Sequence, residues 1–331
     1  MLASSCTILP SWSGSCARPL PLQLAAVTVP SMEPLEELRL LIDRHASSPP
    51  GAMAAAGIVK AVRAESPTEI AHHVLEPMLA VVAQGAKRAV LGDKVFEYGA
   101  GQYLVVSVDL PIAGHVFQAS RERPYLSAGF ALKPTTVATL LLEMAASDRP
   151  SAEPAGLAVS DAPRELLESV VRMLRLVDRP RDAAVLGPML EREILWWLLN
   201  GEQGAMVRQI GLADSRLSQI SRAIRWIRVH HAQPIRIEDL AGMAAMSASS
   251  FHRHFRAVTT MSPLQYQKVI RLQEARSKLL SASQDVAGVG LSVGYDSPSQ
   301  FSREYSRLFG APPGRDVDRL RTASQAVAVS A

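Results

Sequence analysis

The chain has 331 residues, of which 48% are hydrophobic and 20% are charged. This length and composition exclude a wholly disordered chain and leave room for two folded domains. No apolar run approaches the ~18 residues that a membrane-spanning helix needs, so we expect no membrane partner. The two cysteines, Cys6 and Cys16, both lie near the start, which argues against a disulfide framework and a cysteine zinc site.

Charge is unevenly distributed along the chain. From Ser215 to the end there are 16 Lys and Arg against 8 Asp and Glu, whereas residues 1–214 carry 19 basic and 23 acidic residues. A basic segment beside a mildly acidic one is typical of a nucleic-acid-binding domain that is attached to another domain.

Residues 1–31 have no helical or strand periodicity and lack the features of a secretory signal. We expect a disordered tail, or an over-extended start with Met32 as the natural initiator. The next segment, 33–46, has apolar residues at helical spacing and predicts a short helix.

From Ala52 to about Leu132 the sequence changes to short β-type runs that are separated by turn residues. Gly92-Asp93 predicts the turn of a hairpin. Many short strands at close spacing indicate a small antiparallel barrel. The clearest expected strands are Ala80–Gln84, Arg88–Leu91, Lys94–Tyr98, Tyr103–Asp109 and His115–Ala119.

After Pro134 the pattern becomes helical. Helices are expected at Thr135–Ala146, Pro163–Leu176 and Ala184–Leu199, with a loop at Ser147–Leu157. The last helix contains the adjacent residues Trp196 and Trp197, which point to different helix faces. It serves either as a dimer contact or as packing against the chain's own barrel, and the sequence leaves both open.

An internal repeat distinguishes the C-terminal part. Each copy follows a short amphipathic run, so the pattern predicts a helix, a tight turn and a second helix in each unit. A long helix over Pro263–Leu280 is expected to join the two units. In such a unit the second helix enters the DNA major groove. The repeat therefore predicts a sequence-specific regulator that binds double-stranded promoter DNA. The matched residues are Ser249, Phe251, Arg253, Phe255 and Pro263, with counterparts Ser299, Phe301, Arg303, Tyr305 and Pro313.

The second helix of each unit has a predicted core face and a predicted DNA face. Ser247 and Ser297 are expected N-caps, the latter with a capping box from Gln300. Aromatic residues at i, i+4 point inward. The opposite face either contacts bases and phosphates or is an ordinary solvent-exposed surface. Arg pairs with guanine, Gln with adenine and Ser with either. The outward candidates are Ser249, Ser250, His252, Arg253 and Arg256, then Ser299, Gln300, Ser302, Arg303 and Arg307.

The second unit reads V-x-x-V-G-x-x-V-G-Y-D-S-P-S-Q-F-S-R-E-Y-S-R-L-F-G-A-P-P. Residues 215 to about 320 resemble the DNA-binding domain of the AraC/XylS family of bacterial transcription regulators. The resemblance implies two recognition helices in successive major grooves and an effect on RNA polymerase. Gly290 departs from the usual family Ala, and we expect a methyl group to fit there. The implied base-reading positions are Ser249, His252 and Arg253, then Pro298, Ser299, Gln300 and Arg303.

Residues 52–135 are similar to the cupin-like N-terminal domain of one AraC subgroup, most clearly in V-V-A-Q-G-A-K-R-A-V-L-G-D-K-V-F-E-Y-G-A-G-Q-Y-L-V-V-S-V-D-L-P. That resemblance implies binding of a small effector, whose identity is unknown, or dimerisation. Tyr98, Tyr103, Val105 and Phe117 are inward candidates for an effector pocket, or simply barrel core.

We expect no metal and no other cofactor in this barrel. A metal-dependent cupin needs clustered His and carboxylate ligands on adjacent strands, and no H-x-H with a following Glu is present. His115 stands alone, and His72-His73 is expected to lie before the strands begin. The alternative of a cupin-type oxygenase or isomerase with a DNA-targeting domain, and that of an architectural DNA protein, are both disfavoured.

The expected fold class is α+β, with a cupin-like antiparallel β-barrel, a helical linker and an all-α domain of two helix-turn-helix units. We predict a cytoplasmic bacterial one-component regulator, not an enzyme, that forms a homodimer if its linker helix or barrel pairs two chains. The expected segments are a tail at 1–31, a regulatory domain at 32–157, a linker at 158–205, a DNA-binding domain at 206–321 and a disordered tail at 322–331.

Overall fold

The computed structural model describes residues 32–46, 53–54, 59–144, 155–281 and 285–329. The chain divides into the units Met1–Met32 and Glu33–Ala331, and the helices and strands belong to the second. The tail expected at 1–31 lies outside the described residues. In the parts of the chain that the structure describes, no helix is both long and apolar enough to cross a membrane.

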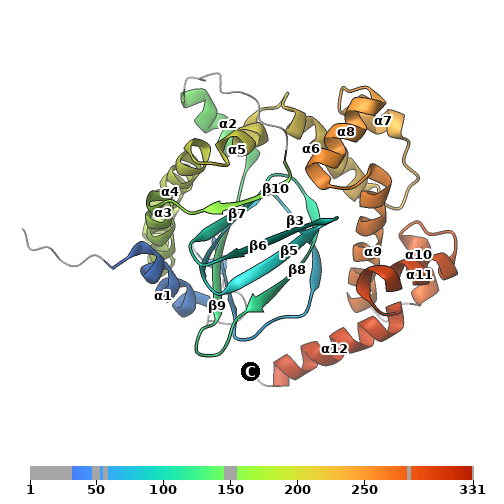
Figure 1. Ribbon diagram of the computed structural model, residues 1–331, viewed down its shortest axis with the longest axis horizontal. Helices are drawn as coiled ribbons and strands as arrows, with labels where there is room; N and C mark the ends of the chain where they lie inside the picture. Colours follow the sequence, from blue (N-terminus) through green and yellow to red (C-terminus); the bar gives the residue numbers. More distant parts are fainter. Residues whose placement is uncertain (1–31, 47–52, 55–58, 145–154, 282–284, 330–331) are drawn as a thin grey trace, which may run out of the picture. The chain divides into compact units, whose positions relative to one another are not determined.

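Two antiparallel sheets form the barrel that the strand pattern predicts (Figure 1). The six-stranded sheet has the order β1 (Met53–Ala54), β2 (Val59–Ala64), β9 (Tyr125–Ala131), β4 (Met78–Gln84), β7 (Gln102–Val106) and β10 (Leu157–Asp161). The four-stranded sheet has the order β3 (Ala71–Leu75), β8 (Leu110–Gln118), β5 (Ala86–Leu91) and β6 (Lys94–Gly99).

Three strand predictions need correction. His72-His73 was expected before the strands but lies within β3, where it pairs with β8. The strand expected over Tyr103–Asp109 ends three residues early, because β7 ends at Val106 and β8 begins only at Leu110. β10 was not predicted, since its place at the edge of the sheet depends on pairing with β7, about fifty residues earlier.

Helices cover the six-stranded sheet on the side away from the other sheet. α1 (Pro34–Ala46) packs on β2, β4 and β9, and it also contacts α3 (Arg164–Arg175). The linker region continues through η1 (Leu176–Asp178), α4 (Pro180–Asn200) and α5 (Gly204–Gly211), and α5 packs on α2 (Pro134–Glu143). α2, α3 and α4 agree with the expected helices within a few residues at each end, whereas α5 was not predicted.

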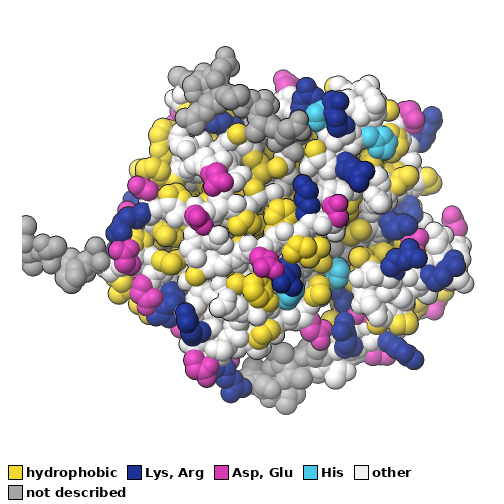
Figure 2. Space-filling view, in the orientation of Figure 1, with side chains coloured by type: hydrophobic (Ala, Val, Ile, Leu, Met, Phe, Trp, Pro, Cys, Tyr) yellow, Lys and Arg dark blue, Asp and Glu magenta, His cyan; other side chains and the backbone are white. Residues whose placement is uncertain are grey.

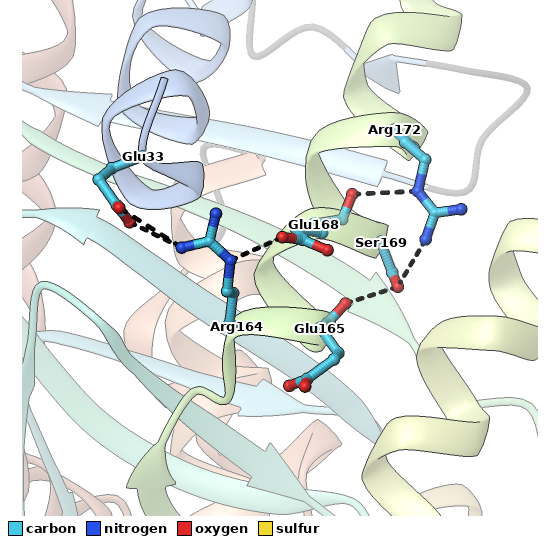
Figure 3. Close-up of polar contacts among 6 residues, drawn as sticks. All are labelled: Glu33, Arg164, Glu165, Glu168, Ser169 and Arg172. Carbon is cyan, nitrogen blue, oxygen red and sulfur yellow. Dashed lines mark hydrogen bonds and ion pairs between the residues drawn. The ribbon is translucent and has the colours of Figure 1, made fainter. Parts of the chain in front are cut away.

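Polar contacts join α1 to α3 at the surface (Figure 3). Arg164 donates to Glu33 at 3.1 Å and to Glu168 at 2.9 Å. Further along α3, Ser169 Oγ donates to the Glu165 carbonyl at 2.7 Å, and Arg172 donates to Ser169 Oγ at 3.3 Å. Because exposed ion pairs contribute ~0–1 kcal/mol each, the apolar contacts between these helices hold the pair together.

The C-terminal helices match the duplicated pattern. They are α6 (Arg216–Val229), α7 (Ile237–Met243), α8 (Ala248–Thr259), α9 (Pro263–Ser281), α10 (Val286–Ser292), α11 (Pro298–Phe309) and α12 (Pro313–Val329). The α7–α8 and α10–α11 pairs form two helix-turn-helix units joined by α9, as predicted. The disordered tail expected from residue 322 is instead helical as far as Val329.

The two units differ in how their cores are built. One continuous cluster of buried side chains runs from the barrel through the first unit and ends at Ile270 on α9. A separate cluster begins at Leu272 and serves the second unit alone. The first unit is therefore part of the regulatory core, whereas the second has a core of its own.

Candidate nucleic-acid interface and regulatory site

Both recognition helices begin at the serine caps that the sequence predicts. Ser247 Oγ accepts from the Ser250 amide and Ser297 Oγ accepts from the Gln300 amide, each at 3.4 Å. The predicted capping box does not form, because the Gln300 side chain donates to Glu304 at 3.4 Å instead. The caps leave the first turn of each helix exposed and open to a ligand.

The inner faces of α8 and α11 are aromatic, as predicted. Phe251 and Phe255 are fully buried with ring centroids 5.4 Å apart. Phe301 and Tyr305 are fully buried in the second unit, at 5.6 Å. Burial of each ring contributes ~1.5–3 kcal/mol, so the core fixes which face of each helix remains outside.

The candidate DNA contacts all lie on the outer faces. Figure 2 shows Lys and Arg side chains spread over the surface of the C-terminal helices. Ser250 and Ser302 are partly exposed. The candidate DNA-contacting residues that are exposed are Ser249, His252, Arg253, Arg256, Pro298, Ser299, Gln300, Arg303 and Arg307.

One histidine that the sequence analysis did not single out lies beside Arg253. His254 is buried, and its Nε2 atom is 2.6 Å from Arg216 Nη1 and 3.5 Å from Arg253 Nη2. Because a guanidinium only donates, Nε2 must accept, which requires a neutral ring with its proton on Nδ1. The histidine thereby orients Arg253 from behind.

In the second unit a polar network surrounds Glu304. Its carboxylate accepts from Lys268 and from the Tyr295 hydroxyl, each at 2.9 Å. Partial burial would raise the pKa of Glu304, but the hydrogen bonds from Lys268, Tyr295 and Gln300 outweigh it and lower that pKa. Lys268 lies close to the recognition helix and Gln300 lies on it, and each is already paired with Glu304.

Arg271 on α9 joins the loop before the first unit to the turn of the second unit. Its Nε donates to the His231 carbonyl at 2.6 Å and its Nη1 donates to the Gly294 carbonyl at 2.8 Å. His231 precedes the first unit, whereas Gly294 lies in the turn of the second. Arg271 is thus not available for a phosphate contact, and its donors help to fix the spacing between the units.

Strand register separates the two faces of the six-stranded sheet. Tyr103 aligns with Val81, and this face carries the helices, because a Cβ on Gly201 would lie 3.8 Å from the Tyr103 hydroxyl. The opposite face carries Gly129 and Tyr125. Tyr125 contributes with burial to raising the pKa of Tyr98 on the other sheet, so this face looks into the barrel interior, the space between the sheets.

Only one of the four effector candidates points into the barrel interior. Tyr98 is buried there, whereas Tyr103 and Val105 face the covering helices. Phe117 is 37% exposed and lies under the Arg88 guanidinium, 5.3 Å from its ring centroid. This corrects the expectation that all four point inward.

The three barrel histidines do not converge. His72 and His73 are adjacent in β3 and point to opposite sides of the sheet, and the His72 ring lies against Phe309 with centroids 5.0 Å apart. His115 lies on β8, next to Phe117. Over the described residues, no group of three or more His, Cys, Asp or Glu could hold a metal ion.

The barrel contacts α6, α9 and the end of α8 through polar groups. Asp109, between β7 and β8, accepts from Arg228 on α6, and its carbonyl accepts from the Tyr266 hydroxyl at 2.8 Å. Thr260, which ends α8, donates to the Leu91 carbonyl at 2.8 Å. A cavity of about 1170 Å³ lies beside these contacts, between β3, α2 and α6.

Comparisons with known proteins agree with this architecture. A family described as "AraC-type transcriptional regulator N-terminus" matches residues 57–206, and one described as "Helix-turn-helix domain" matches residues 240–319. The chain is 25% identical over 152 residues to the HTH-type transcriptional regulator ArgR of Pseudomonas aeruginosa, covering 46% of each protein. It is 26% identical over 160 residues to the transcriptional activator RhaS of Escherichia fergusonii, covering 48% of this chain and 56% of the relative.

The chain spans about half the length of these curated relatives. Among solved structures, unsaturated fatty acid bound ToxT from Vibrio cholerae has the same fold at 10% identity, with a TM-score of 0.51 over 78% of this chain and 94% of that one. The matches cover both the barrel with its helices and the repeated units. The chain is therefore similar to AraC-type transcriptional regulators in residues 57–206 and to a helix-turn-helix domain family in residues 240–319.

Proposed function

We propose that this protein is a sequence-specific regulator that binds double-stranded promoter DNA and senses a small effector through its barrel. The observation that supports it best is the pair of serine-capped helices, α8 and α11, with buried aromatic inner faces and exposed Arg-bearing outer faces. An ordinary solvated helix has no need of an equivalent arginine in both copies. The expected segments 32–157, 158–205 and 206–321 serve here as the regulatory, linker and DNA-binding parts.

The exposed residues of each helix have distinct proposed roles. Arg253 and Arg303 read guanine through O6 and N7, and Gln300 reads adenine when Glu304 releases it. Ser249 and Ser299, in the first turns, contact phosphate or a base edge. Further contacts to backbone or bases are assigned to Ser250, His252, Arg256, Pro298, Ser302 and Arg307.

The two readers on one chain are joined by α9 and carry different side chains, so the DNA site is asymmetric. Recognition helices in successive major grooves contact segments about one helical turn apart, ~34 Å or ~10 base pairs. An effector bound in the barrel would act on the first unit through Asp109, and the bound regulator would act on RNA polymerase. ToxT, whose fold is similar, is described with a bound fatty acid, which supports the idea that such a barrel receives small molecules.

A homodimer would double this site. Val185, Leu186, Met189 and Trp196 are apolar, and their exposed fractions on α4 range from 43% to 68%. Trp197, one position on, is partly buried against the protein's own core. Trp197 therefore packs against the chain's own core, whereas Trp196 is free for a dimer contact. We propose that the exposed face of α4 around Trp196 pairs two chains in the cytoplasm.

The competing proposal is a cupin-type enzyme with a DNA-targeting domain. The scattered positions of His72, His73 and His115 disfavour it, since a cupin metal site needs ligands that converge. We therefore propose that the protein performs no catalysis. Metal bound in stoichiometric amount, measured on purified protein, would favour the enzyme instead.

Selection of genomic DNA fragments by the purified full-length protein, followed by hydroxyl-radical footprinting, tests the proposal. We expect each chain to protect two major-groove segments about one turn apart, with a clear preference over random DNA. Equal affinity for selected and random DNA would contradict sequence-specific binding. Protection of a single groove segment would show that only one unit reads DNA.

A further inference from the structure

Three basic side chains reach the barrel interior from three different strands. Lys60 on β2 is exposed and aligns with Gly129, on the interior face of the six-stranded sheet. His73 on β3 aligns with the buried Ile112, and Lys87 on β5 aligns with the buried Val116, both on the inner face of the four-stranded sheet. The three groups therefore face one another across the space between the sheets.

Small residues leave room around these three side chains. A Cβ added to Gly114 would lie 3.6 Å from Lys87 Cε, so the lysine side chain lies over the position where a larger residue would stand. Ala80 and Gly129 are register partners on the opposite sheet. Both are partly exposed, although they face inward. Solvent therefore reaches this part of the interior.

Other interior positions are filled. Leu104 and Val106 on β7 are 1% exposed or less, as are Leu91 on β5 and Ile112 on β8. The solvent-accessible part is bordered by partly exposed apolar side chains as well as by the cations: Val62, Met78 and Phe96. We call this region, with Lys60, His73 and Lys87, the basic cleft. It combines positive charge with an apolar wall.

The two lysines of the basic cleft differ from other cations in the described part of the chain. Among the described residues, neither Lys60 nor Lys87 forms an ion pair with a carboxylate, whereas the half-buried Arg228 is paired with Asp109. Burial, then Lys87, His72 and Lys60, lower the pKa of His73 to about 4. Burial and then Lys60 lower the pKa of Lys87. A desolvated cation without a counter-ion is costly, and an anion beside Lys87 would relieve that cost.

We propose that the basic cleft binds a small molecule with a carboxylate group, held by Lys60 and Lys87, and an apolar body that contacts Val62, Met78 and Phe96. This assignment rests on the proposed function in one respect, that the barrel is the effector domain, and it names the class of effector. A carboxylate suits the site better than a free phosphate does, because the wall beside the two lysines is apolar and would not solvate further charged oxygens.

Titration calorimetry of the full-length protein with sodium hexanoate and with hexanamide, its uncharged analogue, tests the assignment. We expect hexanoate to bind at least ~10-fold more tightly than hexanamide. Lys60→Met and Lys87→Met should each weaken hexanoate binding about 10-fold and leave hexanamide binding unchanged. Arg88→Met is the matched control, because Arg88 is the neighbour of Lys87 on β5 but faces outward and pairs with Glu97.

Equal binding of hexanoate and hexanamide would overturn the proposal, as would tighter binding of inorganic phosphate. The proposal would also be overturned if the Lys60→Met and Lys87→Met proteins bound hexanoate with the same affinity as the Arg88→Met protein. Lys87→Met should also melt at a higher temperature than the wild type, because it removes a desolvated charge. A lower melting temperature would show that the lysine stabilises the barrel itself and would overturn its assignment to a ligand.

A DNA-binding assay on the same proteins separates this proposal from the proposed function. The wild type and both lysine variants should bind selected DNA equally well in the absence of hexanoate. A wild type that binds this DNA but not hexanoate would overturn the basic cleft alone. A wild type that binds hexanoate but prefers no DNA sequence would overturn the proposed function and leave the cleft intact.

Discussion

Arg253 and Arg303 occupy equivalent exposed positions in α8 and α11. We predict that Arg253→Ala and Arg303→Ala each weaken binding to the selected DNA by about 1–3 kcal/mol, because each removes a bidentate contact to guanine. Gel-shift titration against selected and random DNA measures the loss. Arg121→Ala, the same change at an exposed loop position of the barrel, should leave affinity unaltered. Promoter affinity unchanged in both helix variants would refute the assignment.

Gly290 is a residue whose role the sequence alone suggested wrongly. A methyl group was expected to fit there, but a Cβ at Gly290 would lie 2.9 Å from Cδ1 of Phe301, whose ring is fully buried and unable to withdraw. We now expect Gly290→Ala to lower the melting temperature, with a cost of about 1–3 kcal/mol from overpacking.

Gly288 provides the matched control for this substitution. It is exposed on the same helix, and an added Cβ would meet only Asp285 Oδ2, at an ordinary 3.7 Å. Gly288→Ala should therefore raise stability by about 0.5–1 kcal/mol through the helix propensity of alanine. Thermal melts followed by circular dichroism compare the two. A stabilised Gly290→Ala protein would mean that α11 moves to accommodate the methyl group.

Local rules predict residues whose role is decided within one helix. Ser247, Ser297 and the aromatic residues at i, i+4 could be assigned from spacing alone, because caps and helix faces depend only on near neighbours. Arg271 and His254 could not. Their partners lie up to about forty residues away, and nothing in the local sequence distinguishes them from solvent-facing side chains.

At the level of elements, Asp316 ties α12 to α9 and α11. It is fully buried and accepts from Arg276 at 2.7 and 2.9 Å and from the Tyr305 hydroxyl at 2.9 Å. We predict that Asp316→Asn destabilises the second unit by about 3–5 kcal/mol, because Arg276 would be left partly buried without its counter-ion. Denaturant unfolding measures this, and Asp318→Asn, exposed on the same helix, should change stability by less than about 0.5 kcal/mol.

The same carboxylate predicts a dependence on pH. Burial would raise the pKa of Asp316, but its hydrogen bonds from Arg276 and Tyr305 outweigh burial and lower that pKa. Its contribution is therefore fully present above the unfolded-state pKa of ~3.9 and is lost as the pH falls through the lower folded-state pKa. The stability difference between wild type and Asp316→Asn should accordingly shrink in acid, and a difference that stays constant down to pH 2 would contradict this account.

Among the elements, helices were easier to predict than strands. Periodicity fixed α9 and α11 because a single helix face shows its own pattern. Tyr103 and Val105 lie in a strand that is buried on both faces, so their sequence cannot say which face is the interior. The basic cleft was missed for a related reason, since Lys60, His73 and Lys87 become neighbours only through strand register.

For the whole molecule, α9 and Arg271 fix the distance between the two DNA readers. Insertion of five base pairs between the two protected segments should abolish most specific affinity, because it rotates one segment by half a turn. Arg271→Ala should weaken binding to the natural spacing and reduce the penalty for the insertion. Arg315→Ala removes an exposed charge from α12 and is the control. An Arg271→Ala protein that keeps the full penalty would show that α9 alone sets the spacing.

The division of the core at Ile270 and Leu272 has a consequence for how a promoter would respond to an effector. Only the first unit shares a continuous apolar core with the barrel, whereas the second meets it through single contacts such as that of His72 with Phe309. A ligand-induced change in the barrel should therefore alter the first reader more than the second. The second unit would hold the promoter at all times, and the effector would decide whether the other half-site is occupied. Footprints taken with and without the effector should then differ in one groove segment only, and the regulator would remain on its promoter in both states.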